Sequence, residues 1–281
     1  MISVTDRQAI VVAIQRALAE DIGPGDVTSE WTLEPETQAR GSFLVKEPGV
    51  IAGLEVVEEV FRQVDPAVRF EALVADGTPV HPGDVVARVE GAAISLLSAE
   101  RVALNFLQRM SGIATMARRY VEAVRGYYAI ILDTRKTAPG LRVIDKLAVR
   151  LGGAGNHRLG LYDMVLIKDN HIIAAGGITA AVRRVRARNS QALPVEVEVT
   201  NLDQLAEALA AGVDRILLDN MDLDTMRRAV EMARGRVPLE ASGGITLDNV
   251  AQVAATGVDY ISVGALTHSV KALDVSMDIE M

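Results

Sequence analysis

The second half of the chain alternates short apolar pieces with helix-like segments, and this alternation constrains the fold more than any other feature. The apolar pieces lie at residues 129–133, 162–168, 194–199, 215–219, 238–241 and 259–264. Strands that alternate with helices through short turns are typical of parallel strands in right-handed βαβ units. The six pieces predict an open, incomplete α/β barrel, because a complete barrel has more strands. A doubly wound sheet is the alternative.

The first hundred or so residues differ from the second half in their sequence pattern. A predicted helix in "MISVTDRQAIVVAIQRALAED" is followed by the turn-rich loop "DIGPGDVTSEWT". Short β-like pieces punctuated by Gly and Pro come next, and an amphipathic helix follows from about Ser98. This part is therefore interpreted as a small β-containing domain without an attached cofactor.

Composition excludes several classes of function. The chain has 281 residues with 29 basic and 37 acidic side chains, so its net charge of −8 argues against a nucleic-acid partner. It has no cysteine, which excludes disulfides and thiolate chemistry. No apolar run is long enough for a membrane span, and the first residues show no signal-peptide pattern, so a cytoplasmic location is expected.

Every predicted strand ends in a polar or glycine-containing cluster. These clusters are Asp133-Thr134-Arg135-Lys136, Lys168-Asp169-Asn170-His171, Glu196 and Glu198 before Thr200-Asn201, Asp219-Asn220, Ser242-Gly243-Gly244, and Gly264-Ala265-Leu266-Thr267-His268. In α/β barrels the active site lies at the carboxyl ends of the strands. Asp133, Asp169, Asp219 and Thr200 could each instead cap a following helix. Six clusters in register favour a common site.

The charges in these clusters predict two kinds of ligand. Arg135, Lys136 and Lys168 supply cations, and the glycine-rich loop "GGAGNHRLGL" adds His157 and Arg158. Glu196 and Glu198 share one face of their strand, since strand side chains alternate. Glu198 and Asp219 suit a magnesium ion that bridges phosphate oxygens and sugar hydroxyls. The implied substrates are a multiply charged organic acid and a phosphorylated, magnesium-bound partner.

A phosphate is expected at the last two strand ends. Gly243-Gly244 precedes "ITLDNV", which predicts backbone N–H groups at the start of a helix. The stretch "SVGALTH" on the next strand strengthens this interpretation, because barrel phosphate sites often form in these loops.

Several stretches together closely resemble the quinolinate phosphoribosyltransferase family. They are "DTRKTAPGLR", "NHRLGLYDMVLIKDNH", "VEVEV", "ILLDNM", "LEASGGI" and "GVDYISVGALTHS", with "EDIGPGDVTS" and "ERVALNFLQRMSGIAT" in the N-terminal part. The resemblance covers nearly the whole chain. One departure is visible: the family loop usually has three glycines before Asn-His-Arg, and here Ala154 and Gly155 alter it.

The resemblance implies an N-terminal α/β sandwich domain at residues 1–112 and an open, incomplete α/β barrel at 113–270. It implies that a C-terminal tail, 271–281, packs back on the N-terminal domain. It also implies a homodimer with shared active sites, in which Arg101 reaches the site of the partner subunit.

The resemblance further implies roles for individual residues. Quinolinate is expected to be bound by Arg101, Thr134, Arg135, His157, Arg158 and Lys168. Phosphoribosyl pyrophosphate is expected to contact Lys136, Glu198, Asp219, Ser242, Gly243, Gly244, Val263, Gly264, Ala265 and His268. Lys136, Glu198 and Asp219 are the expected catalytic residues, and Glu198 and Asp219 the expected ligands of Mg²⁺.

The implied reaction transfers a phosphoribosyl group to quinolinate with loss of CO₂ and forms nicotinate mononucleotide, as in de novo NAD biosynthesis. Three alternatives stay open: a transferase of the same fold that acts on nicotinate, a molybdenum-associated paralogue, and a non-catalytic barrel that binds a phosphorylated ligand.

Overall fold

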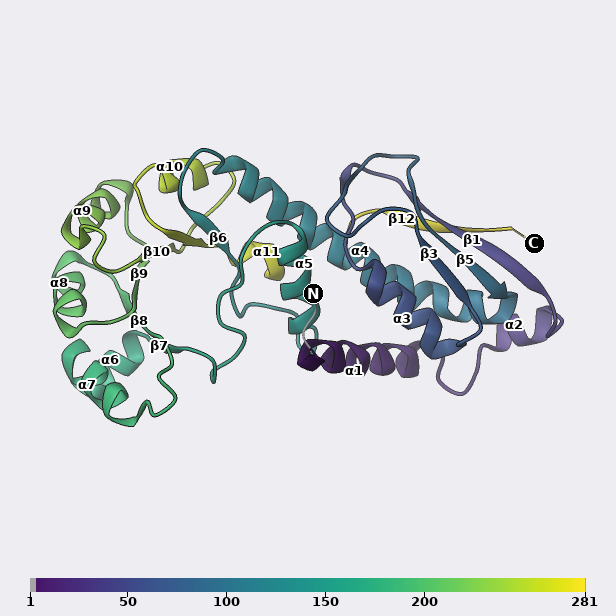
Figure 1. The fold of residues 1–281 in the computed structure, drawn as a ribbon, viewed down its shortest axis with the longest axis horizontal. Coiled ribbons are helices and arrows are strands. Elements are labelled where there is room, and N and C mark those ends of the chain that lie inside the picture. The colour runs from purple at the N-terminus through teal and green to yellow at the C-terminus, as the bar shows by residue number, and fades with distance from the viewer. Residues whose placement is uncertain (1–3, 281) are drawn as a thin grey trace. The chain divides into compact units, whose positions relative to one another are not determined.

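The computed structural model describes residues 4–280, which form two compact units (Figure 1). The first unit runs to Arg118, adds residues 137–153 and ends with the segment from Thr267. The second unit consists of residues 119–136 and 154–266. Among the helices of residues 4–280, none is both long and apolar enough to cross a membrane.

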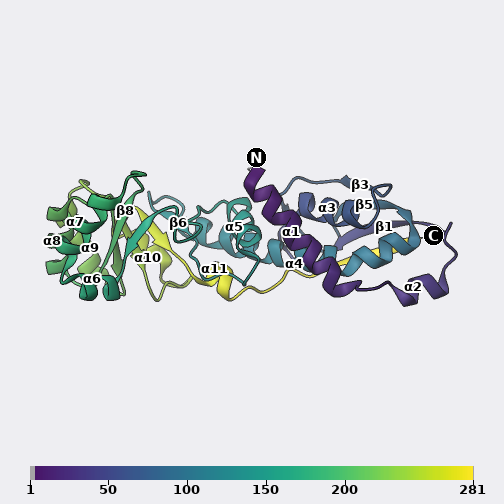
Figure 2. The ribbon, with the colours of Figure 1, turned by 90° about the horizontal axis from the view of Figure 1, so that it is seen from below.

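The first unit contains an antiparallel sheet in the order β12-β1-β5-β3. Its strands are β1 (Gln38–Val45), β3 (Arg69–Ala72), β5 (Val85–Ala92) and β12 (Val275–Glu280), and a separate pair is formed by β2 (Gly49–Val50) and β4 (Pro79–Val80). Its helices are α1 (Val4–Asp21), α2 (Val27–Thr32), α3 (Leu54–Val64), most of α4 (Ala93–Ala123), and α5 (Arg142–Leu151). Helices α1, α3 and α4 lie on one face of the sheet (Figure 2).

The C-terminal segment completes this sheet. Strand β12 pairs with β1 along its whole length, from Arg40 opposite Glu280 to Val45 opposite Val275. The buried side chain of Phe43 on β1 packs edge-on against Phe61 of α3, with ring centroids 6.1 Å apart. The last described residues therefore belong to the same sheet as the first strand of the chain.

Helix α5 follows the first strand of the barrel in sequence but belongs to the first unit. Its fully buried Asp145 accepts two hydrogen bonds of 2.8 Å from the guanidinium group of Arg109 on α4. Asp145 also accepts a hydrogen bond from the backbone N–H of Ala138. A buried carboxylate needs such partners, so this ion pair holds α5 against α4. The predicted domain boundaries placed residues 137–153 with the barrel.

The second unit is an open α/β barrel built on six parallel strands. The strand order is β6-β11-β10-β9-β8-β7, so β6 and β7 are its edges. The strands are β6 (Ile130–Leu132), β7 (Val165–Ile167), β8 (Val195–Val199), β9 (Arg215–Asp219), β10 (Leu239–Ser242) and β11 (Tyr260–Ser262). Each lies within or at one of the six predicted apolar pieces.

Helices follow the strands and cover the outer face of the curved sheet (Figure 1). They are α6 (Asp169–Ala175), α7 (Ile178–Arg188), α8 (Leu202–Ala211), α9 (Leu223–Ala233), α10 (Val250–Ala254) and α11 (Ala265–His268), the last of which crosses into the first unit. Asn201 and Asp222 cap α8 and α9 by accepting hydrogen bonds from the N–H groups of Gln204 and Thr225. Thr200 and Asp219, which the sequence offered as caps, are therefore not used in that way.

The strand register places the charged side chains on one face of the sheet, together with Leu166 and Leu217, because residues paired across parallel strands point to the same side. The outer face carries Val195, Val197, Val199, Ile216, Leu218, Leu239, Ala241 and Ile261, all buried. The inner face carries Glu196, Glu198, Arg215, Asp219, Glu240, Ser242, Tyr260 and Ser262. The predicted pairing of Glu196 and Glu198 on one face is confirmed, and that face lines the inside of the barrel.

Candidate active site

A short segment after the glycine-rich turn is fixed to the end of β6. Gly155 forms a parallel bridge with Leu132, and its N–H donates to the carbonyl oxygen of Ile131. A Cβ on Gly155 would lie 2.8 Å from Leu132 Cδ2, so glycine permits this close approach. The buried carboxylate of Asp133 then accepts hydrogen bonds of 2.8 Å from the Asn156 side chain and the His157 backbone. Asp133 thus orients the loop rather than capping a helix.

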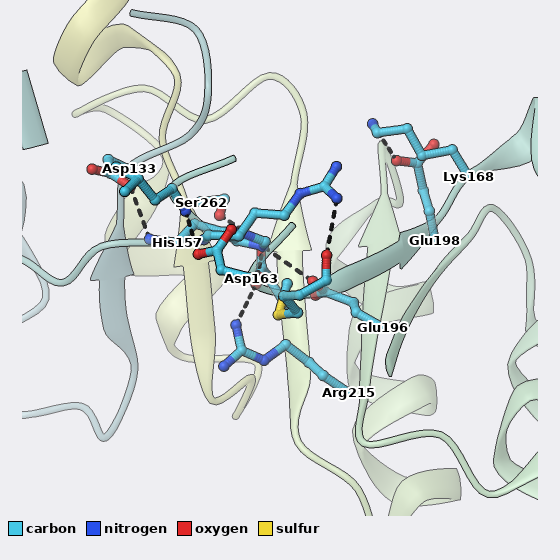
Figure 3. Close-up of polar contacts among 12 residues, drawn as sticks. Asp133, His157, Asp163, Lys168, Glu196, Glu198, Arg215 and Ser262 are labelled. Atoms are coloured by element: carbon cyan, nitrogen blue, oxygen red, sulfur yellow. Dashed lines mark hydrogen bonds and ion pairs between the residues drawn. The ribbon is translucent and has the colours of Figure 1, made fainter. Parts of the chain in front are cut away.

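This anchoring directs the His157 ring toward the inner face of the sheet (Figure 3). Its Nε2 lies 3.1 Å from Glu196 Oε2 and 3.4 Å from Glu240 Oε2, and both carboxylates are fully buried. Its Nδ1 accepts a hydrogen bond of 2.7 Å from the backbone N–H of Arg158. Both ring nitrogens therefore have partners within the protein.

Glu240 is held from three directions. Its Oε2 lies 3.1 Å from Arg215 Nη1, and its Oε1 accepts a hydrogen bond from the hydroxyl group of Ser262. The guanidinium group of Arg215 lies over the ring of Tyr260, 4.1 Å from its centroid. The carboxylate is consequently fixed in direction by residues of β9 and β11.

Burial and neighbouring charge shift the pKa values of this cluster. Burial raises the pKa of Glu196, and the charge of Glu240 adds to this effect. Burial also opposes ionisation of Glu240, but contacts with His157, Ser262 and Arg215 outweigh it and lower the pKa of Glu240. Burial disfavours the imidazolium form of His157, whereas the two glutamates favour it. The cluster therefore retains a proton at neutral pH.

The position of that proton follows from the backbone. An N–H group can only donate, so the Nδ1 atom that it faces acts as an acceptor. The neutral ring then carries its hydrogen on Nε2, and the retained proton lies on Glu196, whose pKa is raised. With Arg215 ionised and Glu240 ionised, the cluster as a whole is neutral.

The same three groups, His157, Glu196 and Glu240, lie close enough together to coordinate a metal ion. Arg215 already balances one carboxylate, and the retained proton balances the other. A divalent cation added to this buried cluster would leave uncompensated positive charge, which is costly away from water. The geometry is thus better satisfied by a proton than by a metal.

Two guanidinium groups, those of Arg135 and Arg158, lie within electrostatic range of each other beside this cluster. Burial lowers the pKa of Arg158, and the nearby charge of Arg135 lowers it further. Arg158 Nη1 donates to the carbonyl oxygen of Met164 at 3.2 Å. The carboxylate of Asp163 accepts hydrogen bonds from the N–H groups of Leu159 and Gly160, at 2.6 and 2.8 Å, and so fixes the loop that follows Arg158. Neighbouring guanidinium groups repel each other, and an anion bound between them removes that repulsion.

Lys168 and Glu198 form an ion pair, with Nζ 2.9 Å from Oε2. Asp219 accepts a hydrogen bond from the Asn220 side chain at 3.0 Å. Glu198 and Asp219 come from adjacent strands and share the inner face. Their carboxylate oxygens are the ligand type that Mg²⁺ prefers, so the donor set fits the predicted ion.

The loop after β10 differs from its prediction in one respect. Helix α10 begins only at Val250 and spans five residues, so Gly243 and Gly244 do not lie at a helix start. The intervening turn is closed by Asn249, whose side chain accepts from the N–H of Thr246 and donates to the carbonyl of Gly244. An Asn–Thr turn can follow a glycine pair as readily as a helix can, and the sequence pattern did not distinguish the two.

Three comparisons with known proteins bear on this geometry. The family profile of the quinolinate phosphoribosyl transferase C-terminal domain matches residues 113–278, and that of the N-terminal domain matches residues 26–111. The chain belongs to the quinolinate phosphoribosyltransferase family. It is 48% identical over 286 residues to a chloroplastic nicotinate-nucleotide pyrophosphorylase (carboxylating) of Oryza sativa, covering 95% of this chain and 76% of the relative.

Two further similarities support membership of this family. A probable nicotinate-nucleotide pyrophosphorylase of Synechocystis is 49% identical over 270 residues, covering 95% of this chain and 91% of that protein. The crystal structure of NadC from Streptococcus pyogenes superposes with a TM-score of 0.95 at 42% identity, covering 100% and 99% of the two chains. The recognition of the family from sequence motifs is confirmed.

The family motifs are distributed over both units. Thr134, Arg135, Lys136, His157, Arg158, Lys168, Glu198, Asp219, Ser242, Gly243, Gly244, Val263, Gly264 and Ala265 lie in the second unit, whereas Arg101 and His268 lie in the first. The Lys136 side chain is exposed, and its backbone N–H donates to Thr134 Oγ1. The N–H of Val263 donates to the carbonyl of Leu132, so its predicted contact with a phosphate cannot use that group.

Sequence reasoning missed four residues of this region: Glu240, Arg215, Ser262 and Asp163. Glu240 had a detectable signal, because it is an acidic residue inside the apolar piece 238–241, as Glu196 is in its own strand. Arg215, Ser262 and Asp163 had no comparable signal, since each is ordinary for a strand end or a loop.

The loop after β10 leads to a stability prediction. A Cβ at Gly243 (φ +95°) would lie 2.2 Å from Asn220 Oδ1, whereas a Cβ at Gly244 (φ +63°) would meet nothing within 4 Å. Both alanine variants incur the left-handed strain of about 1–2 kcal/mol. We expect Gly243→Ala to lower the free energy of unfolding, measured in urea, by roughly 1–3 kcal/mol more than Gly244→Ala. Equal losses in the two variants would show that Asn220 moves aside freely.

Proposed function

We propose that the chain transfers the phosphoribosyl group of phosphoribosyl pyrophosphate to quinolinate and releases CO₂ and pyrophosphate, giving nicotinate mononucleotide. The observation that carries this proposal is that the charge of Arg135 acts on the partly buried Arg158 beside the polar inner face. Two guanidinium groups within electrostatic range of each other suit a substrate with two neighbouring carboxylates better than one with a single carboxylate. Membership of the quinolinate phosphoribosyltransferase family supports the same substrate pair.

The quinolinate carboxylates are assigned to the cations. Arg135 and Arg158 would bind them by paired hydrogen bonds, with Thr134 nearby in the same cluster. Lys168 is half-exposed and paired with Glu198, so it can exchange that partner for a substrate carboxylate. His157 is committed to Glu196, Glu240 and the Arg158 backbone, which favours an indirect contribution to quinolinate binding.

Phosphoribosyl pyrophosphate is assigned to Lys136, to the carboxylates of Glu198 and Asp219, and to the loops after β10 and β11. Lys136 would offset the charge that develops on pyrophosphate, and the N–H groups around Ser242, Gly243, Gly244, Gly264 and Ala265 would receive the 5′-phosphate. Glu198 and Asp219 would hold Mg²⁺, which when bound supplies charge neutralisation for the leaving pyrophosphate. This ion is part of the proposal.

The chemistry then needs mainly positioning and charge. The pyridine nitrogen attacks the anomeric carbon of the ribose as the bond to pyrophosphate breaks, and positive charge develops on the sugar. Carboxylates fixed on the inner face, Glu198 and Asp219, stabilise that charge. The ring nitrogen, now positively charged, stabilises the electron pair that stays on the adjacent ring carbon when the carboxylate leaves as CO₂, and that carbon then takes up a proton.

We further propose a homodimer with shared active sites. Arg101 is exposed on α4, with its guanidinium group 4.0 Å from Glu100, and the family resemblance assigns it to the site of the partner subunit. The cytoplasmic location stays a prediction, since the relatives include a chloroplastic rice protein and mitochondrial tobacco proteins. A transferase that acts on nicotinate is the second candidate, but it would need fewer cations around the base than this site offers.

The first test measures CO₂ released from carboxyl-labelled quinolinate in the presence of phosphoribosyl pyrophosphate and Mg²⁺. We expect release that depends on both substrates and stops with excess chelator. Nicotinate is the control substrate, and turnover of nicotinate without turnover of quinolinate would refute the proposal. Binding without any CO₂ release would indicate a binding module instead.

Substitutions of the adjacent cations Arg135 and Lys136 should have different kinetic effects. We expect Arg135→Gln to raise the KM for quinolinate about ten- to a hundredfold, the loss typical of a charged hydrogen bond, and to leave the KM for phosphoribosyl pyrophosphate nearly unchanged. Lys136→Gln, its neighbour, should instead lower kcat and weaken phosphoribosyl pyrophosphate binding. Steady-state kinetics with each substrate varied in turn is the measurement, and identical profiles for the two variants would contradict the assignment.

The shared site makes a complementation prediction. Arg101→Ala and Lys136→Ala homodimers should both be inactive, but random mixing should recover roughly a quarter of wild-type activity, because half of the dimers carry one intact site of two. Subunits would be exchanged by mild denaturation and assayed for CO₂ release. If mixing restores no activity although hybrid dimers form, each site is completed within one subunit.

A further inference from the structure

The Arg215–Glu240 ion pair lies on the inner face of the barrel and has no part in the proposed substrate contacts. Arg215 begins β9, and Glu240 lies in the middle of β10. Glu240 is fully buried, and Arg215 is three-quarters buried, with its side chain 23% exposed. Replacing such a pair by apolar groups is often neutral or stabilising, so stability alone is a weak reason for its presence.

The pair ends a continuous chain of contacts that leads to Arg158. Figure 3 labels Arg215, Ser262 and His157 of this chain. Tyr260 supports the Arg215 guanidinium group, Arg215 and Ser262 hold the two oxygens of Glu240, and Glu240 Oε2 lies 3.4 Å from His157 Nε2. On its other side, His157 Nδ1 accepts the backbone N–H of Arg158. Each contact leaves the next group little freedom of rotation.

The His157 ring is therefore a brace between the sheet and the backbone of Arg158. Its Nδ1 can accept from the Arg158 N–H only while its proton stays on Nε2, and Nε2 keeps that proton because buried carboxylates face it. The groups that face the ring are Glu196 from β8 and Glu240 from β10, with Asp133 holding the backbone of the same residue. Loss of the Glu240 charge would permit the ring to turn or to exchange tautomers, and Arg158 would lose its fixed direction.

We propose that Glu240 and Arg215 are positioning residues that act through His157 to hold Arg158 in the direction in which it binds a substrate carboxylate. The substrate part of this inference rests on the proposed function, since Arg158 is there assigned to quinolinate. The Arg215–Glu240–His157 part rests on the contacts alone. An arrangement in which one residue orients the ligand-binding residue from behind is common in preorganised sites.

The test compares Glu240→Gln and Arg215→Gln with Arg186→Gln. Arg186 forms an exposed ion pair with Asp214, 3.0 Å apart, elsewhere in the same unit, so it controls for the loss of an ion pair as such. We expect both site variants to raise the KM for quinolinate about ten- to a hundredfold, with the KM for phosphoribosyl pyrophosphate unchanged. The double variant should be no worse than the more affected single variant, because the two residues act along one chain of contacts. Arg186→Gln should match the wild type.

A second measurement reads His157 without any substrate. The chain has four histidines, so the imidazole ¹⁵N signals are few. The two signals that disappear in His157→Gln belong to the ring nitrogens of His157. We expect the wild-type protein to show Nδ1 as an acceptor and Nε2 as protonated, and Glu240→Gln to change both signals. Ser262→Ala, which removes one hydrogen bond from Glu240, should move the His157 signals in the same direction by a smaller amount. This variant replaces the charge variants in the test if they fail to fold.

The outcomes separate the inference from the proposed function. If the wild type does not release CO₂ from quinolinate, the proposed function fails, and the ¹⁵N signals still decide whether Glu240 sets the state of His157. If quinolinate is turned over but Glu240→Gln and Ser262→Ala leave the His157 signals unchanged, the inference fails alone. Equal rises in the KM for both substrates, or a loss of kcat alone in proportion to lost stability, would also overturn it.

Discussion

The carboxylates of Glu196 and Glu240 set the conditions for the rest of the barrel unit, because a charge removed from water must be balanced where it lies. Neither reaches solvent, and both face the inside of the sheet. Arg215 and Ser262 balance Glu240, and a retained proton balances Glu196, which faces His157 Nε2. His157 reaches the glutamates because Asp133 fixes its backbone to the end of β6. The need to neutralise two buried acids thus determines the path of the loop that carries Arg158.

This arrangement gives the inner face two levels. The lower level consists of Glu196, Glu240, Arg215 and Ser262, which are buried or nearly so and make contacts only with protein groups that keep them in place. The upper level contains Lys168, Glu198 and Asp219, whose partners lie at the strand ends and can be exchanged. Electrostatic preorganisation needs such a division, because groups that meet a substrate must be held by groups that do not move.

The sequence predicted the barrel strands well, since each is a short apolar run bounded by turn residues, and it placed the polar clusters at the correct strand ends. It could not place α5, because the Arg109–Asp145 pair joins residues 36 positions apart and neither residue is unusual where it stands. It did not indicate that His157 would turn inward, since its partners Glu196 and Glu240 come from two later strands. The predicted helix start at Gly243 was wrong because local hydrogen bonds of Asn249 form a turn there instead.

The pairing of β12 with β1 has a consequence for synthesis of the chain. Strand β1 is made early, but one of its two neighbours consists of residues 275–280, which follow every residue of the barrel unit. Until those residues leave the ribosome, β1 presents an open edge of the kind that invites pairing with other chains. The unit that begins first is thus the last to be completed, and a chain interrupted after the barrel would carry an aggregation-prone sheet.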